Sequence, residues 1–167
     1  MKLINRYELK QFILDGITTE ELKEYDYSNI SDMSCMFSGC ESLTTIPCLD
    51  TSNVIIMSEM FTHCTSLISI PKFDTSNVIN MNRMFSGCTS LISVPELNTS
   101  NVIKMSRMFS GCTSLISVPE LNTSNVINMH DMFVNCFNLE YCFYDSRIDY
   151  NEINSTKLKQ NHPEYFI

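Results

Sequence analysis

The amino-acid sequence predicts an α/β solenoid of about five coils, each made of one short helix and one short strand. Three observations lead to this fold class: a motif that returns every 24 residues, an apolar spacing that changes within each repeat, and chain ends that depart from the pattern. The chain has 167 residues, of which 44% are hydrophobic, so one domain with a buried core is expected.

The 24-residue period is the main feature of the sequence. The pattern M-x-x-M-F-x-x-C-x-x-L occurs five times, and the segment 85–103 returns unchanged as 109–127. The five copies begin at Met33, Met57, Met81, Met105 and Met129. A propeller blade needs about 40 residues or more, whereas one coil of a leucine-rich-repeat solenoid takes about 20–29. The period therefore predicts a leucine-rich-repeat-like solenoid.

The first half of each repeat is predicted to be a short amphipathic helix. At 100° per residue, the apolar residues of the third copy share one stripe: Val78, Met81, Met84, Phe85 and Cys88. Thr-Ser-Asn precedes the stripe and suits a helix N-cap, and a glycine in three of the copies suits the helix end. The same residues can also form side-chain ladders between coils. The functional alternative is a threonine array that orders water, as in ice-binding solenoids. Capping is the interpretation that we favour.

The second half of each repeat is predicted to be a short strand. Around Leu91–Val94 the apolar spacing is three rather than 3.6, and the Thr, Ser, Ile and Val residues favour extended backbone. Pro95 then ends the strand. Stacked coils would place these strands side by side, about 4.8 Å apart.

The two ends of the chain are expected to cap the solenoid. A terminal coil without a cap would expose its apolar layer and its unpaired strand edge. We expect residues 1–27 to form a capping helix (residues 2–15) and a partial first coil, and residues 28–143 to form the solenoid. Residues 144–167 are expected to form an aromatic C-terminal cap, with a short helix near 156–160.

Five of the eight cysteines follow the same period, which predicts a buried column rather than a disulfide framework or a metal site. They are Cys40, Cys64, Cys88, Cys112 and Cys136. Thiolate and thioether ligands suit a soft metal such as Cu(I), but one cysteine per coil makes a ladder and not a tetrahedron. Neither a metal nor a cofactor is therefore expected. Cys35 and Cys48 stand outside the column, at positions predicted to be exposed.

Nothing in the sequence predicts catalysis. The three histidines, His63, His130 and His162, share no predicted column with a nucleophile or carboxylate in the manner of a triad. Neither G-x-x-x-x-G-K-S/T nor G-x-G-x-x-G, the two phosphate-binding loops, occurs. We therefore expect no enzymatic activity and name no catalytic residue.

The charge and the N-terminus bear on partners and location. The formal net charge is −8, which argues against direct nucleic-acid binding, since that needs clustered Lys and Arg. No apolar run reaches the 18 or more residues of a membrane span. Polar residues interrupt every apolar run of Met1–Gly16, so no signal peptide is recognised. A cytoplasmic location is expected, with the cell surface as the alternative.

One column of the predicted strand is a candidate interaction face. If the leucines at 67, 91 and 115 point inward, their neighbours should point outward: Ile68, Ile92 and Ile116, flanked by Ser69, Ser93 and Ser117. An exposed apolar stripe with hydroxyls at its rim suits binding. The alternative is that neighbouring coils or the caps cover it. A second candidate is the basic cluster of Arg83, Lys104 and Arg107, on outer helix positions.

The repeats resemble a known family. The pattern D-T-S-N-V-I-x-M-x-x-M-F-x-x-C-T-S-L-I-S-I/V-P is similar to the repeats of BspA-like leucine-rich-repeat proteins, and the resemblance runs from about Asp26 to Leu139. It implies a leucine-rich-repeat-like solenoid without enzymatic activity of its own. Members of the family are usually bacterial surface proteins or proteins of mobile elements and viruses.

Two functions are compatible with these features. The first is an intracellular protein–protein interaction module, of which an inhibitor of a host protein encoded by a phage or mobile element is one form. The alternative is a surface or secreted protein of recognition and adhesion. The sequence predicts a protein partner in both cases, and it leaves the identity of the partner and the oligomeric state open.

Overall fold

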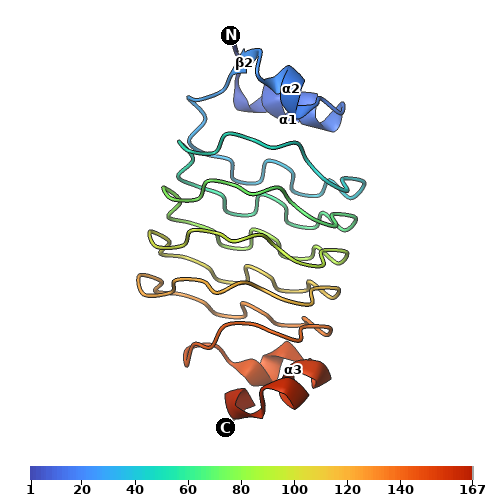
Figure 1. Ribbon diagram of the computed structural model, residues 1–167, viewed down its shortest axis with the longest axis vertical. Helices are drawn as coiled ribbons and strands as arrows, with labels where there is room; N and C mark the ends of the chain where they lie inside the picture. Colours follow the sequence, from blue (N-terminus) through green and yellow to red (C-terminus); the bar gives the residue numbers. More distant parts are fainter. Residues whose placement is uncertain (167) are drawn as a thin grey trace.

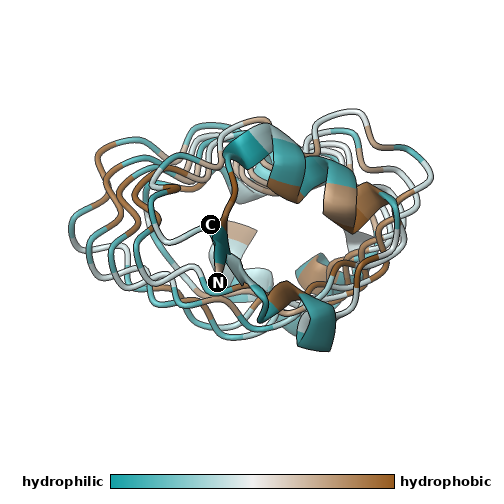
Figure 2. Ribbon diagram, turned by 90° about the horizontal axis from the view of Figure 1, so that it is seen from above, coloured by the Kyte–Doolittle hydropathy of each residue, from teal (hydrophilic) through white to brown (hydrophobic). Residues whose placement is uncertain are grey.

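The computed structural model describes residues 1–166 as a stack of coils along one axis, with short helices at both ends (Figure 1). The N-terminus lies at one end of the stack and the C-terminus at the other. Seen along the axis, successive coils lie over one another and form a flattened ring (Figure 2). The chain is thus a repeat solenoid, as the 24-residue period predicts.

The N-terminal segment forms a small unit against the first coil. Strand β1 (Lys2–Leu3) pairs in parallel with β2 (Tyr25–Asp26), and two helices connect them, α1 (Arg6–Leu14) and α2 (Thr19–Leu22). Helix α1 lies within the predicted range 2–15. The apolar side of this N-terminal unit packs against the solenoid. Four of its residues belong to the continuous buried core: Ile4, Leu9, Ile13 and Leu22.

The helix predicted in each repeat is wrong, because the backbone forms consecutive turns instead. The N–H of Met84 donates to the carbonyl of Met81 at 3.2 Å, and that of Cys88 donates to Phe85 at 3.0 Å. In the first of these turns the third residue is Arg83, with φ 53°. A type II turn requires a positive φ there, whereas an α-helix requires about −63°. The same positive φ occurs in every coil, at Cys35, Glu59, Arg83, Arg107 and Asp131.

The backbone donors that a helix would use internally point to the neighbouring coil. The N–H of Met81 donates to Lys104 at 2.9 Å, and the N–H of Phe85 donates to Met108 at the same distance. Between them, Arg83 donates to Ser106. Each coil therefore builds a parallel ladder with the next. Because two successive turns also place apolar residues three and four apart, they reproduce the spacing of an amphipathic helix.

The predicted strand is reduced to isolated bridges. Ser93 pairs with Ser117, and Ser117 with Tyr141, each as a single parallel bridge. The N–H of Ile116 donates to the carbonyl of Ile92 at 2.9 Å. Within residues 1–166 the only strands of two residues or more are β1 and β2. An α/β class therefore does not describe the coils, which consist of turns and single-residue pairings.

A stack of phenylalanine rings runs through the core. The rings of successive coils are parallel to within 12°, with centroids 5.5–5.7 Å apart. The stack consists of Phe37, Phe61, Phe85, Phe109 and Phe133, each at most 1% exposed. The two methionines of each repeat motif form two further columns of the same buried core. They are Met33, Met57, Met81, Met105 and Met129 in one column and Met36, Met60, Met84, Met108 and Met132 in the other. Stacked aromatic pairs contribute roughly 0.5–1.5 kcal/mol beyond the apolar area they bury, so the stack stabilises each coil–coil junction.

Thr-Ser-Asn forms ladders between coils and caps no helix. The hydroxyl of Thr75 donates to the carbonyl of Asn98 in the next coil at 2.9 Å. The amide of Asn101 donates to the carbonyl of Ser76 in the preceding coil at 2.7 Å. Thr51, Thr75 and Thr99 are each 1% exposed. A water-ordering threonine array is therefore excluded for this column, because its hydroxyls are turned into the protein.

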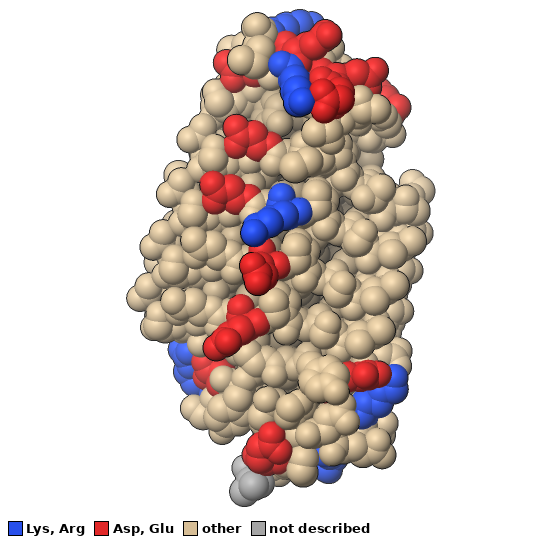
Figure 3. All heavy atoms as spheres, in the orientation of Figure 1, with Lys and Arg blue, Asp and Glu red and all other residues tan. Residues whose placement is uncertain are grey.

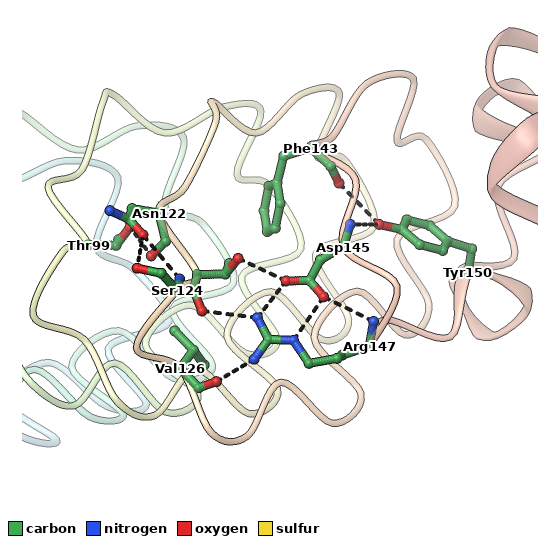
Figure 4. A network of polar contacts seen from close by, with 9 residues as sticks. Thr99, Asn122, Ser124, Val126, Phe143, Asp145, Arg147 and Tyr150 are labelled. Carbon is green, nitrogen blue, oxygen red and sulfur yellow. Dashed lines mark hydrogen bonds and ion pairs between the residues drawn. The ribbon is translucent and has the colours of Figure 1, made fainter.

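The C-terminal segment replaces a sixth coil. It contains the 3-10 helices η1 (Tyr150–Ile153) and η2 (Pro163–Phe166) and the helix α3 (Thr156–Asn161), which occupies the place predicted for a short helix. In earlier coils the threonine hydroxyl donates to a carbonyl of the next coil. At the end, Thr123 donates instead to the carboxylate of Asp145 at 2.8 Å (Figure 4).

Arg147 completes this ending (Figure 4). Its guanidinium forms a two-point ion pair with Asp145, with Nε–Oδ1 at 2.9 Å and Nη2–Oδ2 at 2.6 Å. The same group donates to the carbonyls of Thr123 and Val126 in the fifth coil. The Tyr150 hydroxyl accepts from the N–H of Asp145 at 2.7 Å. Cap side chains thus bond to a hydroxyl and to two carbonyls at the end of the last coil.

Candidate interaction surfaces

The column predicted as an interaction face is exposed in the solenoid. Ile68, Ile92 and Ile116 are 48%, 45% and 40% exposed. Backbone bonds between the coils hold the column in line: Ile92 donates to Ile68 at 3.3 Å, and Ile116 donates to Ile92 at 2.9 Å. Neither the neighbouring coils nor the caps cover these side chains fully.

A rim of hydroxyls accompanies this column. Ser69 and Ser93 are exposed and Ser117 is half-buried. In the next coil the serine position is taken by Tyr141, which is 53% exposed and pairs with Ser117. The surface is therefore an apolar stripe with a polar edge that ends on an aromatic side chain.

A second isoleucine column was missed by the sequence reasoning. Ile55, Ile79, Ile103 and Ile127 are 43%, 40%, 39% and 76% exposed. The last three of them line a shallow groove of about 620 Å³ together with Asn77, Asn101 and Asn125. The signal was present, because isoleucine follows each of these Asn-Val pairs. The helical interpretation of that segment drew attention to its buried stripe instead.

The predicted basic cluster is broken up by ion pairs. Arg83 Nη1 lies 3.7 Å from Glu59 Oε1 in the preceding coil. Arg107 Nη2 lies 2.7 Å from Asp131 Oδ2 in the following coil, and its Nε donates to the same oxygen. Lys104 is exposed. Because each arginine is matched by a carboxylate of another coil, the three residues do not form one basic patch.

Charged side chains are sparse on the face seen in Figure 3. They gather at the N-terminal end, in one column down the middle and around the C-terminal end, and the flanks of the face between the two ends are uncharged. Within residues 1–166, the helices are all too short or too polar to cross a membrane.

The periodic cysteines lie in the core, as predicted. Cys64, Cys88, Cys112 and Cys136 are buried and Cys40 is half-buried, whereas Cys35 and Cys48 are exposed. Burial raises the pKa of the Cys64 and Cys136 thiols to about 12. In the part of the chain that the structure describes, there is no group of three or more His, Cys, Asp or Glu side chains that could hold a metal ion.

The fold and these surfaces define a class of protein: a repeat solenoid with exposed apolar columns on a regularly paired backbone. The family described as "Mycoplasma protein of unknown function, DUF285" matches residues 8–117 and 57–156. These two ranges together span most of the chain, and the protein belongs to this family.

The chain was also compared with curated proteins and with solved structures. No curated protein matches the chain. Among solved structures, it is similar to the leucine-rich-repeat protein of T. pallidum, with 21% sequence identity and a TM-score of 0.41. That match covers 64% of this chain and 69% of the T. pallidum chain.

Proposed function

We propose that the protein is a non-enzymatic scaffold that binds a partner protein through its isoleucine columns. The observation that carries the proposal is the exposure of seven isoleucines, between 39% and 76%, at only two positions of the repeat. They are Ile55, Ile79, Ile103 and Ile127 in one column and Ile68, Ile92 and Ile116 in the other. Single exposed apolar residues are ordinary on protein surfaces, but contiguous apolar patches mark binding sites.

The rigidity of the backbone favours binding by these columns. Each isoleucine of the inner coils is anchored by a bond between coils, such as Ile103 N–H to Ile79 carbonyl at 2.9 Å. Binding therefore orders little backbone, and the conformational entropy lost on association is small. Serines and asparagines around the apolar residues supply the polar rim that typical protein interfaces have.

The proposal can be tested by changing one column at a time. One variant carries Ile92→Glu and Ile116→Glu in one column, and a second carries Ile79→Glu and Ile103→Glu in the other, with the unchanged protein as the control. All four positions are 39–45% exposed, so both variants are expected to fold. The tagged proteins are then used for capture with cross-linking from cells of the source organism.

The expected result is that at least one of the two pairs abolishes capture of a stoichiometric partner that the unchanged protein captures. Circular dichroism and thermal unfolding show that both variants keep the fold. Capture of the same partner by both variants at the level of the unchanged protein would contradict the proposal.

We further propose that this binding takes place inside the cell. All eight cysteines are free thiols, which suits a reducing compartment. Inhibition of a host protein is one form of this function, and adding the purified chain to an assay of the captured partner tests it. Recovery of the chain only at the cell surface, in fractionated cells, would support the alternative of recognition or adhesion.

A further inference from the structure

The backbone ladder between coils ends unevenly at the C-terminal cap. In the fourth coil, the N–H groups of Met105, Arg107 and Phe109 donate to carbonyls of the fifth coil at 2.9–3.0 Å. The three earlier coils make the same bonds. The ladder thus uses the N–H of every second residue in this part of the coil.

The equivalent donors of the fifth coil have no acceptor in the described part of the chain. Among residues 1–166, no group accepts from the N–H of Met129, Asp131 or Phe133. The next donor in the row, Asn135, reaches the carbonyl of Glu152 in η1 at 3.4 Å. Among the described residues, the cap therefore supplies an acceptor for one of these four N–H groups and none for the other three.

These donors belong to the wall of a pocket. It has a volume of about 240 Å³ and lies between the fifth coil (residues 129–134) and the C-terminal cap (residues 147–149 and 152). Met129 is 5% exposed and Phe133 is 1% exposed, so the strand-like edge is set into the protein. A buried N–H without an acceptor costs roughly 1–3 kcal/mol, which an incoming acceptor would recover.

The charges at the pocket define what can enter. Arg147 is paired with Asp145, and Asp131 is paired with Arg107, with the Nε2 of His130 3.1 Å from the same carboxylate. Asp149 and Glu152 are exposed carboxylates that have no ion-pair partner among residues 1–166. The electrostatic potential of the pocket is therefore negative. It disfavours anionic ligands and favours a ligand that has uncharged hydrogen-bond acceptors and, beside them, a positively charged group.

We propose that this pocket binds a short extended peptide segment containing Lys or Arg. The donors of the fourth coil find carbonyls of alternate residues in the fifth coil, such as His130 and Met132. An extended chain presents alternate carbonyls on one side, so it can continue the ladder by strand addition. Its cationic side chain pairs with Asp149 or Glu152. This site is separate from the isoleucine columns and extends the proposed function to a second contact.

The test uses the full chain, labelled with nitrogen-15, and the capped peptide Ac-Ala-Lys-Ala-Lys-Ala-NH2. On titration, the amide signals of Met129, Asp131 and Phe133 are expected to move and their hydrogen exchange to slow. The amides of Met105, Arg107 and Phe109 serve as the internal control and are expected to stay in place. A peptide with Glu in place of Lys is expected to leave all six signals unchanged.

A paired variant tests the charge contribution. Asp149→Asn with Glu152→Gln is expected to weaken binding of the lysine peptide by about threefold or more. Glu120→Gln, at an exposed position elsewhere on the solenoid, is expected to change nothing. The Ile92→Glu, Ile116→Glu variant should bind the peptide normally, which separates this site from the isoleucine columns.

Three outcomes would overturn the proposal. The first is that none of the three amides moves at millimolar peptide. The second is that the glutamate peptide moves them equally. The third is that the three amides already exchange as slowly in the free protein as those of the fourth coil, because the donors are then not open.

Discussion

The Sγ of Cys88 lies 3.0 Å from the carbonyl oxygen of Phe61, one coil earlier. The same contact, at 3.0–3.1 Å, joins Cys64, Cys112 and Cys136 to the phenylalanine of the coil before each of them. The cysteine column therefore ties consecutive coils together from inside the core. Its thiols act as small apolar groups with a weak donor, which is the usual role of buried free cysteine.

Native thiol labelling should divide the cysteines into two groups. Cys48 is exposed and is expected to react promptly with a disulfide reagent at pH 8, and Cys35 is exposed but should react more slowly, because partial burial and the Glu59 carboxylate raise its pKa; Cys88 is expected to react only on unfolding. Burial raises the pKa of the Cys88 thiol, which adds a chemical barrier to the steric one. Mass spectrometry of labelled peptides checks this. Labelling of Cys88 at the rate of Cys48 would show that the coils open readily.

Removing one ring from the phenylalanine stack should destabilise the whole solenoid. Phe85 is fully buried between Phe61 and Phe109, so Phe85→Ala leaves a cavity and breaks two stacked pairs. The expected loss in the free energy of unfolding is about 3–5 kcal/mol. Urea unfolding followed by circular dichroism measures it. Phe137→Ala is the control, because Phe137 is 48% exposed and should change stability by well under half as much.

Substitutions at turn residues with positive φ should cost different amounts of stability, depending on the side chain introduced. Gly111 has φ +74°, and a Cβ there would find its nearest neighbour, the Cα of Gly87, at 3.6 Å. Gly111→Ala is therefore expected to cost about 1–2 kcal/mol through backbone strain rather than through a clash. Gly111→Asn should cost less, because Asn135 already occupies this repeat position with φ 61°. Equal losses in thermal unfolding would contradict the argument.

The C-terminal cap should make stability depend on acid pH. Hydrogen bonds from Arg147 lower the pKa of Asp145 to about 2, below its unfolded value near 4. A depressed folded pKa gives stability that is fully present above about pH 4 and is lost as the pH falls towards 2. After allowance for solvent screening, the contribution is on the order of 1 kcal/mol.

Asp145→Asn provides the comparison for this effect. The unfolding free energies of the variant and the unchanged protein should differ by a constant amount above about pH 5. The difference should shrink between pH 4 and pH 2, as Asp145 becomes protonated in the unchanged protein. A difference that stays the same over this range would show that the carboxylate does not stabilise the cap through its charge.

The periodic positions of the core could be predicted from the sequence, but their backbone conformation could not. Met81, Met84 and Phe85 are buried as their spacing indicated. The same spacing is compatible with a helix or with two turns, so the spacing does not decide between them. The deciding feature is Arg83, whose positive φ no residue-type preference indicates. Its N–H finds an acceptor, Ser106, only when the next coil is present.

The candidate surfaces divide in the same way. The isoleucines at 68, 92 and 116 were found from alternation along a strand, which is a local rule. The column at 55, 79, 103 and 127 lay inside a segment read as helix, so its exposure was missed. The predicted basic cluster is not one patch, because Arg107 forms an ion pair with Asp131 of the next coil. The sequence alone does not show that these two side chains meet.

The sequence by itself determined the 24-residue coil, the membership of the core columns and the presence of distinct ends, because each of these is written in residue type and period. The tertiary structure decided where the backbone hydrogen bonds go. Inside a coil the choice between helix and turns is nearly balanced, since short helices are marginal alone. Stacking decides in favour of the turns, because the backbone N–H groups of one coil then donate to carbonyls of the next coil. The bond from Phe85 N–H to the Met108 carbonyl is one example.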